Sequence, residues 1–149
     1  DLSQDLDDNF AVMIDATMSR RNGYVFEVNP LGTQRDGEVI EEQAPTTNDS
    51  MVDPSWDGLW ISAARITGDG WTATIAIPFS TLNFGGASSG GAAGAGWGAV
   101  NWGLNFRRFI RRKNEEDEWS GYRRVFGFWR VSQAGELEGL SGLEHSRLW

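Results

Sequence analysis

The sequence contains no cysteine and a single histidine, His145, among its 149 residues. Without cysteine the chain holds no disulfide framework, no thiolate nucleophile and no cysteine-ligated metal. A histidine metal cage or a serine–histidine–aspartate triad would rest on His145 alone, and its neighbours add no supporting residues. We therefore expect this chain not to be an enzyme. A glycoside-active enzyme ranks third among the hypotheses below, because carboxylates are plentiful but no pair has a defined separation.

Basic residues and long apolar runs are also scarce. Lysine and arginine number 13 against 21 aspartates and glutamates, which gives a net charge of −8 and a pI of about 4.6. This balance argues against a nucleic-acid partner, which needs a basic face to meet phosphates. No apolar run approaches the roughly 20 residues of a membrane helix, so no transmembrane segment is predicted in this chain.

A period of two dominates the pattern that is present. Apolar residues alternate over 9–16 and again over 23–29, and the polar turn between them ends in Asn22-Gly23. The same arrangement recurs at 59–66 and 71–77, around Asp69-Gly70. Asn-Gly and Asp-Gly between alternating runs are strong hairpin signals. The sequence therefore predicts two β-hairpins.

The remaining segments complete an all-β prediction. Further strands are expected at 102–112 and 125–132, and no segment of ten or more residues shows a helical period. Segments 41–58 and 85–98 are predicted to be long loops, because they are rich in glycine, serine, proline, asparagine or aspartate. Short strands separated by turns predict one domain over residues 1–149, an antiparallel β-sandwich of immunoglobulin-like or jelly-roll-like type.

Four stretches in order carry a family resemblance. They read "DDNFAVMIDA", "RRNGYVFEVNPLGTQRDG", "WDGLWISAARITGDGWTATIAIPFSTLNF" and "WGLNFRRFIRRKNEEDEW". From about Asp7 to about Leu140 the chain resembles the family 9-like carbohydrate-binding domain. More narrowly, it resembles the version that precedes a predicted outer-membrane β-barrel domain of unknown function in bacterial envelope proteins. The resemblance implies a β-sandwich, an exported periplasmic or outer-membrane-associated location, and a glycan-binding role without catalysis.

The chain departs from that family pattern at its start. The family domain has further strands before the "DDNF" position, and this sequence lacks them. A sandwich without its first strands exposes unpaired edges and one side of its core. We therefore expect the missing strands to lie outside this chain, or a partner protein to cover the gap.

Polar residues after the second predicted strand are candidates for a glycan site. Asn29, Gln34 and Asp36 carry the amide and carboxylate groups that sugar hydroxyls bind, since each hydroxyl both donates and accepts. The alternative is a polar network that holds the hairpin to a neighbouring strand. Both interpretations fit the sequence.

Tryptophans supply the apolar part of such a site, because the C–H face of a sugar stacks on an indole ring. Trp56 lies in a predicted loop and is expected to be exposed, whereas Trp60 is undecided. Trp71 is expected in the core, because it alternates in phase with Ile75. The alternative for Trp56 is a structural plug.

A basic cluster follows in the 102–112 strand. Arg107 and Arg111 are candidate sugar, anion or partner contacts, and Arg108 is expected to point inward because it alternates in phase with Phe106. An inward arginine needs a carboxylate, for which Asp15 and Glu27 are the candidates. The alternative is a buried ion-pair network beside a solvated turn.

No cofactor is expected, although oxygen-rich segments 5–9 and 48–53 could ligate a structural calcium ion. The leading hypothesis is a non-catalytic, carbohydrate-binding-like module. The rival is an accessory subunit that docks on other protein subunits of an envelope complex. Leu148 and Trp149 are candidate anchors for such a partner, since both are poor solvent-exposed residues.

Overall fold

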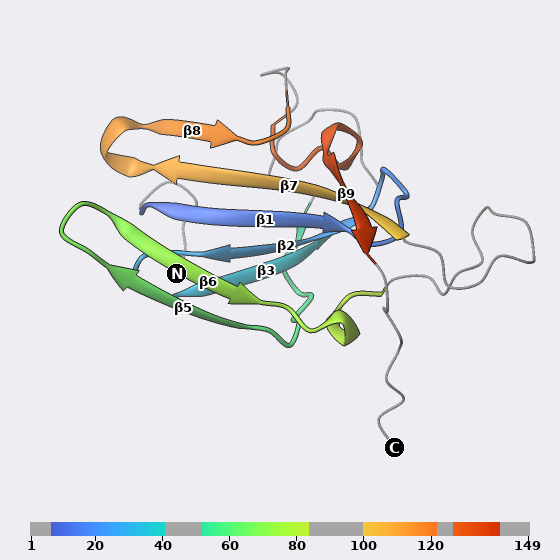
Figure 1. The fold of residues 1–149 in the computed structure, drawn as a ribbon, viewed down its shortest axis with the longest axis horizontal. Helices are drawn as coiled ribbons and strands as arrows, with labels where there is room; N and C mark the ends of the chain where they lie inside the picture. The colour runs from blue at the N-terminus through green and yellow to red at the C-terminus, as the bar shows by residue number, and fades with distance from the viewer. Residues whose placement is uncertain (1–6, 41–51, 84–99, 122–126, 141–149) are drawn as a thin grey trace, which may run out of the picture.

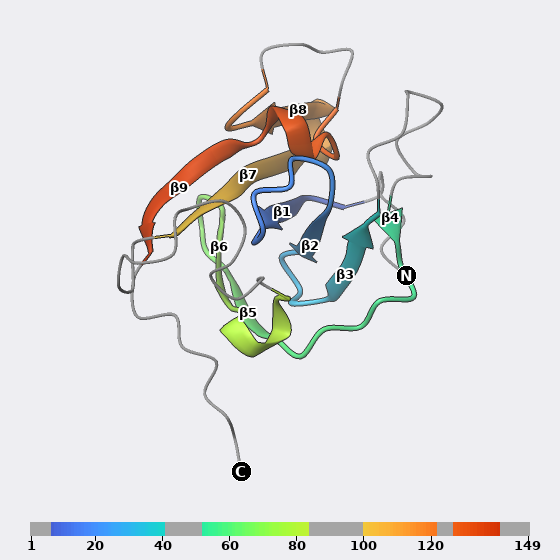
Figure 2. The same ribbon diagram turned by 90° about the vertical axis from the view of Figure 1, so that its right-hand side faces the viewer.

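The computed structural model describes residues 7–40, 52–83, 100–121 and 127–140. It confirms the predicted all-β fold, an antiparallel sandwich in which a large sheet faces a smaller one (Figures 1 and 2). The helices within these ranges are 3₁₀ turns of three residues, too short to cross a membrane.

The large sheet has seven strands and the small sheet has two. The large sheet contains β1 (Asn9–Asp15), β2 (Gly23–Val28), β3 (Gln34–Val39), β4 (Val52–Asp53), β7 (Val100–Ile110), β8 (Glu115–Glu118) and β9 (Gly135–Leu140). The small sheet contains β5 (Ile61–Ile66) and β6 (Trp71–Ala76). The large sheet has the order β4-β3-β2-β1-β7-β8, and β9 also pairs with β7. Because β1 occupies one edge of the long strand β7, β8 and β9 share the other edge.

Both predicted hairpins are present, and one predicted strand is wrong. β1 pairs with β2 and β5 pairs with β6, each in antiparallel register. The described part of the predicted strand at 125–132 instead forms turns and a 3₁₀ helix (Val131–Gln133). Gly127 adopts a left-handed φ of 57° there, which interrupts the extended backbone. The last described strand is β9, which the sequence did not predict.

One face of the large sheet packs against the β5–β6 hairpin, and we call it the hairpin face. Val12, Ile14 and Phe26 are buried on it, together with Trp60 from the segment that leads into β5. The cross-strand register places Val12 between Phe26 and Phe106, so the three side chains share this face. This cluster is the core between the two sheets.

The opposite face is covered by residues 127–134, and we call it the cover face. Met13, Val25 and Val39 from three strands are buried against Phe128 and Trp129. The strands are therefore apolar on both faces at their centre. A purely alternating pattern of apolar and polar residues, with one face in water, does not describe this sheet.

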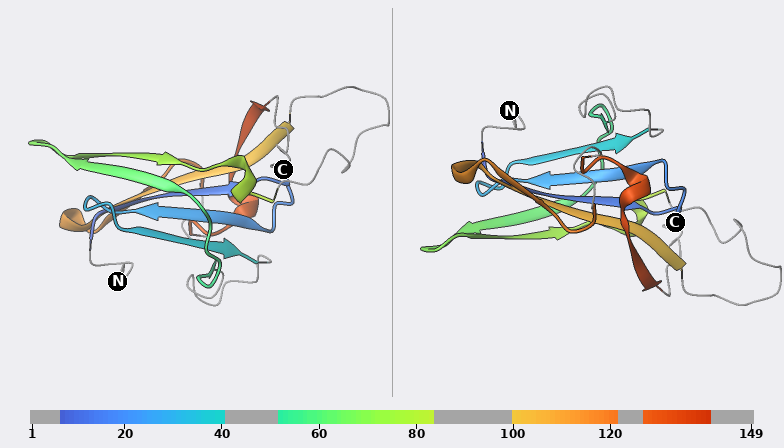
Figure 3. Two further views of the ribbon diagram at one scale, coloured as in Figure 1. Left: turned by 90° about the horizontal axis from the view of Figure 1, so that it is seen from below. Right: turned by 90° about the horizontal axis from the view of Figure 1, so that it is seen from above.

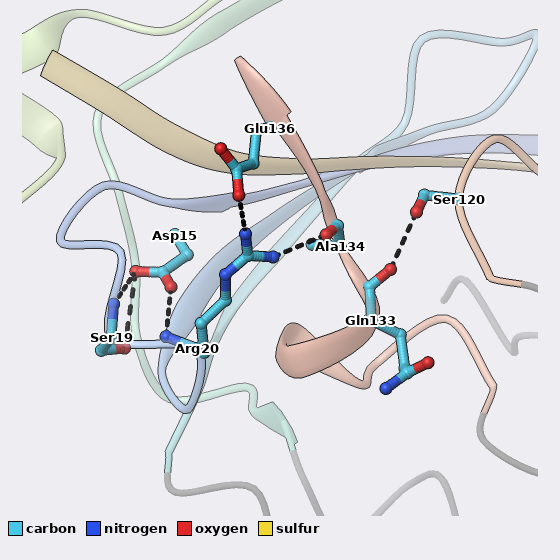
Figure 4. Close-up of polar contacts among 7 residues, drawn as sticks. All are labelled: Asp15, Ser19, Arg20, Ser120, Gln133, Ala134 and Glu136. Carbon is cyan, nitrogen blue, oxygen red and sulfur yellow. Dashed lines mark hydrogen bonds and ion pairs between the residues drawn. The ribbon is translucent and has the colours of Figure 1, made fainter. Parts of the chain in front are cut away.

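Arg20 in the β1–β2 turn fastens the covering segment to the sheet (Figure 4). Its guanidinium donates to the carbonyl oxygen of Ala134 at 2.7 Å and forms an ion pair with Glu136. Asp15 shapes the turn by accepting backbone N–H bonds from Ser19 and Arg20 at 3.1 and 2.7 Å. Arg20, the first of the paired arginines between these strands, therefore has a structural role.

Candidate functional site

Asn29, Gln34 and Asp36 take part in structural contacts. Asn29 is 3% exposed, and its Oδ1 accepts the backbone N–H groups of Leu31 and Thr33 at 3.0 and 2.9 Å. It therefore stabilises the β2–β3 turn as an Asx cap. Gln34 and Asp36 lie on β3 and face the small sheet.

The contacts of these two β3 residues tie the sheets together. Gln34 Nε2 donates to Ser62 Oγ at 2.9 Å. Asp36 Oδ2 accepts the backbone N–H of Gly58 at 2.7 Å and the indole N–H of Trp60 at 3.2 Å. The geometry matches the network interpretation that the sequence had left open.

Trp56 and Trp60 fill the space between the sheets. Trp60 is 6% exposed and meets Phe26 edge-on, with ring centroids 5.3 Å apart. Trp56 is half-buried and lies 4.8 Å from the ring of Tyr24. The expectation of an exposed Trp56 is wrong, because the chain leading into β5 crosses the end of the core and turns this ring inward.

Arg107 is the inward arginine, and the expectation that Arg108 points inward is wrong. Arg107 is 6% exposed and forms an ion pair with Glu27 at 2.7 Å, while Arg108 is exposed. The guanidinium lies 5.0 Å from the ring centre of Trp129, a cation–π distance. Arg108 does share its face with Phe106, but the β5–β6 hairpin does not bury it there.

Arg107 belongs to a row of charges across the cover face. The register places Arg35, Glu27, Ala11, Arg107 and Glu118 side by side on β3, β2, β1, β7 and β8. The small Ala11 leaves room for the guanidinium to reach Glu27. Burial raises the pKa of Glu27, while Arg107 and Arg35 lower it. Burying two charges costs desolvation that offsets much of their attraction, whereas removing one partner of such a pair leaves an uncompensated buried charge.

Glu118 ends this row with a strongly shifted pKa. Partial burial, the neighbouring Glu116 charge and a hydrogen bond with Glu116 raise the pKa of Glu118 to about 7, against an opposing effect of Arg107. Glu118 therefore changes its charge near neutral pH. Two carboxylates alone do not make a metal site, and no group of three or more candidate ligands occurs in the described ranges.

Of the other predicted site residues, Arg111 comes near Asn29 alone, beside the β2–β3 turn. Arg111 is exposed in the β7–β8 turn, where its backbone N–H donates to Asp8 Oδ1 at 2.7 Å. Leu148 and Trp149 lie outside the described residues, as do most of the calcium candidates at 48–53 and part of those at 5–9. The predicted ligand-binding residues do not form one groove, because only Asn29 and Arg111 share a hollow, of about 490 Å³, and the others are engaged between the sheets or on the cover face.

An unpaired strand edge is the most distinctive open feature of the described structure. Thr67 N–H donates to the Gly70 carbonyl oxygen at 2.8 Å, which makes these two residues a hydrogen-bonded pair. Pairs alternate in an antiparallel ladder, so the next bonded partners on β6 are Thr72, Thr74 and Ala76. The N–H and C=O groups of Trp71, Ala73 and Ile75 therefore point to the outer edge of β6, where no described strand pairs with them.

A partly exposed apolar floor lies beside this edge. Figures 1 and 2 show β6 on the β7 side of the small sheet, with β7 and β8 extending beyond it. Leu104 and Phe106 of β7 are only half-buried, and Trp119 beside Phe106 is 57% exposed. Ala73 faces the large sheet yet is exposed. We call the β6 edge with this floor the edge groove.

The edge groove ends in a hollow at the tip of the β5–β6 hairpin. Its volume is about 500 Å³, and its lining includes Phe10, Asp69, Trp71, Thr72 and Arg108. Aromatic rings, a guanidinium and hydroxyl groups therefore meet here. The sequence had assigned Trp71 to the core, because alternation identifies its face but not how far that face is covered.

The comparisons with known proteins add no relative. No protein-family description, curated protein or solved structure matches the chain. The family 9-like resemblance accordingly stays a prediction from the sequence.

Proposed function

We propose that this chain is a non-catalytic binding module that docks another polypeptide in its edge groove. The observation that carries the proposal is the outer edge of β6, which no strand of the described ranges pairs with, beside a partly exposed apolar floor. Natural edge strands are protected by charges, prolines or bulges. β6 reads Trp-Thr-Ala-Thr-Ile-Ala, without a charge or a proline, and pairs with β5 in unbroken register.

The small sheet also needs support that a partner would supply. A two-stranded sheet is marginally stable in water, and here it must cover a seven-stranded one. Leu59 and Ile61, at the start of β5, are 78% and 69% exposed. Pairing at the open edge would widen the small sheet and bury more of the floor.

A carbohydrate ligand is the second candidate, and the hollow at the hairpin tip favours it. Trp71 and Phe10 offer rings for stacking, while Arg108 and Asp69 offer a donor and an acceptor for hydroxyls. This site differs from the glycan site predicted from sequence, whose residues are engaged in structural contacts. Replacing Trp71 with alanine should abolish binding on a glycan array if this candidate is correct.

We further propose an exported, envelope-associated location, which rests on the family resemblance alone. Fractionation of cells that carry the full-length protein tests it. Recovery with the periplasm or outer membrane supports the proposal, and recovery with the cytoplasm contradicts it.

Photocrosslinking tests polypeptide docking in the source cells. A benzoylphenylalanine at Trp119 samples the floor, and one at Leu31, which is 79% exposed at the β2–β3 turn, serves as the control. We expect a discrete polypeptide adduct from position 119 and none from position 31. Equal adducts from both positions, or none from either, would contradict docking in the edge groove.

A further inference from the structure

We infer that the partner binds by strand addition: an extended segment with alternating apolar residues pairs with the outer edge of β6. This inference rests on the docking function proposed above and specifies the chemistry of the partner. Its basis is the backbone of three residues, Trp71, Ala73 and Ile75, whose N–H and C=O groups point away from β5. Another strand satisfies such alternating pairs directly.

The floor determines which side chains this strand carries. A strand added to β6 would lie about 4.8 Å from it, above the uncovered part of β7. One face of the added strand would then rest on Leu104 and Phe106, and the other would continue the outer face of β6, where Thr72 and Thr74 are exposed. The partner segment is therefore apolar at every second residue and polar between.

The overhang of the large sheet argues against a second copy of this chain as the partner. β7 and β8 extend past the β6 edge, as Figure 1 shows, whereas β9 lies beyond the end of β6 (Figures 1 and 3). If β6 paired with β6 of another copy, the overhanging strands of the two large sheets would meet in the same space.

The opposite edge of the small sheet is less available for the same role. β5 lies on the β3 side, where Gln34 bonds to Ser62 and Asp36 bonds to Gly58 and Trp60. β5 also carries the charged Arg65, which is exposed. This difference between the edges provides a matched control.

The test uses a synthetic peptide of alternating valine and threonine flanked by lysines. A peptide of identical composition, with its valines and threonines in separate blocks, is the comparison. Calorimetric titration up to about 1 mM covers the affinity range of weak peptide contacts. We expect the alternating peptide to bind and the block peptide to bind at least about ten-fold more weakly, because only alternation matches edge and floor together.

Proline substitution separates edge pairing from simple apolar contact. Ala73→Pro removes an N–H that points to the open edge of β6, and Ala64→Pro removes the equivalent N–H on β5. We expect Ala73→Pro to weaken peptide binding about five- to ten-fold, as for a lost hydrogen bond, and Ala64→Pro to leave it unchanged. If either proline variant fails to fold, Ala73→Lys and Ala64→Lys replace the pair, because an edge lysine also blocks strand addition.

Two results would overturn the inference: no binding of the alternating peptide, or equal effects of the Ala73 and Ala64 variants. A dimer that depends on Ala73 would also overturn it in favour of a second copy. If position 119 crosslinks a polypeptide in cells but the alternating peptide does not bind, the result supports docking in the edge groove and contradicts strand addition. If the crosslink itself is absent, the proposed function fails.

Discussion

The buried pair Glu27–Arg107 gives the most quantitative prediction. Their side chains are 1% and 6% exposed, and their N–O distance is 2.7 Å. Arg107→Met keeps most of the apolar volume and leaves the Glu27 carboxylate buried without its cation. Removing one member of a buried pair costs about 3–5 kcal/mol. This is a large share of the roughly 5–15 kcal/mol that stabilises a typical domain.

Urea unfolding followed by tryptophan fluorescence measures this loss. With an m-value of about 2 kcal/mol per molar, the midpoint should fall by about 2 M. The double variant Glu27→Gln/Arg107→Met removes the unpaired charge and should recover most of the loss. A cost below about 1 kcal/mol for Arg107→Met, or no recovery in the double variant, would refute a buried, coupled pair.

The pH dependence of the same variant gives an independent check. Burial already raises the pKa of Glu27 above its ordinary 4.5, and Arg107 opposes the rise. Without Arg107 the folded pKa should rise further. A raised carboxyl pKa contributes stability below the unfolded pKa, and that contribution is lost as pH rises through the folded pKa. The deficit of Arg107→Met should therefore be small near pH 4 and large near pH 8; a deficit independent of pH would contradict this account.

Two further predictions concern single carboxylates. Asp36→Ala removes the carboxylate that accepts the indole N–H of Trp60, and we expect the free energy of unfolding in urea to fall by about 1–3 kcal/mol, with a shift in tryptophan emission. A change within about 0.5 kcal/mol, as for an ordinary surface site, would contradict the inter-sheet contact. Because the pKa of Glu118 is raised to about 7, wild-type stability should decline from pH 4.5 to 7, by about 1 kcal/mol after solvent screening of this half-exposed group. Glu118→Gln should flatten that decline, and an unchanged pH profile would show that Glu116 or another group causes it.

The hairpins were predictable because their signals are local. Asn22-Gly23 and Asp69-Gly70 sit between alternating runs, and the structure pairs the strands on either side in the expected way. The all-β sandwich followed from the same pattern. Alternation along β7 also identified correctly that Arg108 and Phe106 share a face.

What local patterns could not determine is how each face is covered. Arg107 rather than Arg108 is buried, because residues 127–134 cover the second face of the sheet, whereas Arg108 borders an open hollow beneath the tip of the β5–β6 hairpin. β8 reads Glu-Glu-Asp-Glu and has no apolar signal. It is a strand because it lies in register with the arginine-rich end of β7, where opposite charges meet across the strands.

The same limit applies to the candidate site. The type and order of Asn29, Asp36 and Trp56 resemble a glycan site, yet tertiary contacts engage them in a turn, an inter-sheet bond and a ring cluster. The absence of charge from β6 was visible in the sequence. An uncharged strand is open to a partner only where one of its edges is unpaired. That depends on the order of the strands in the sheet, which the sequence of β6 does not contain.

Amide hydrogen exchange at β6 tests the central claim most directly. It is measured for the isolated protein and for the same protein in the assembly purified from its source. We predict that the amides of Trp71, Ala73 and Ile75 exchange rapidly in the isolated chain and become protected in the assembly, while those of Thr72 and Thr74 are protected in both. Equal exchange at Trp71, Ala73 and Ile75 in the two samples would contradict docking of a strand on this edge.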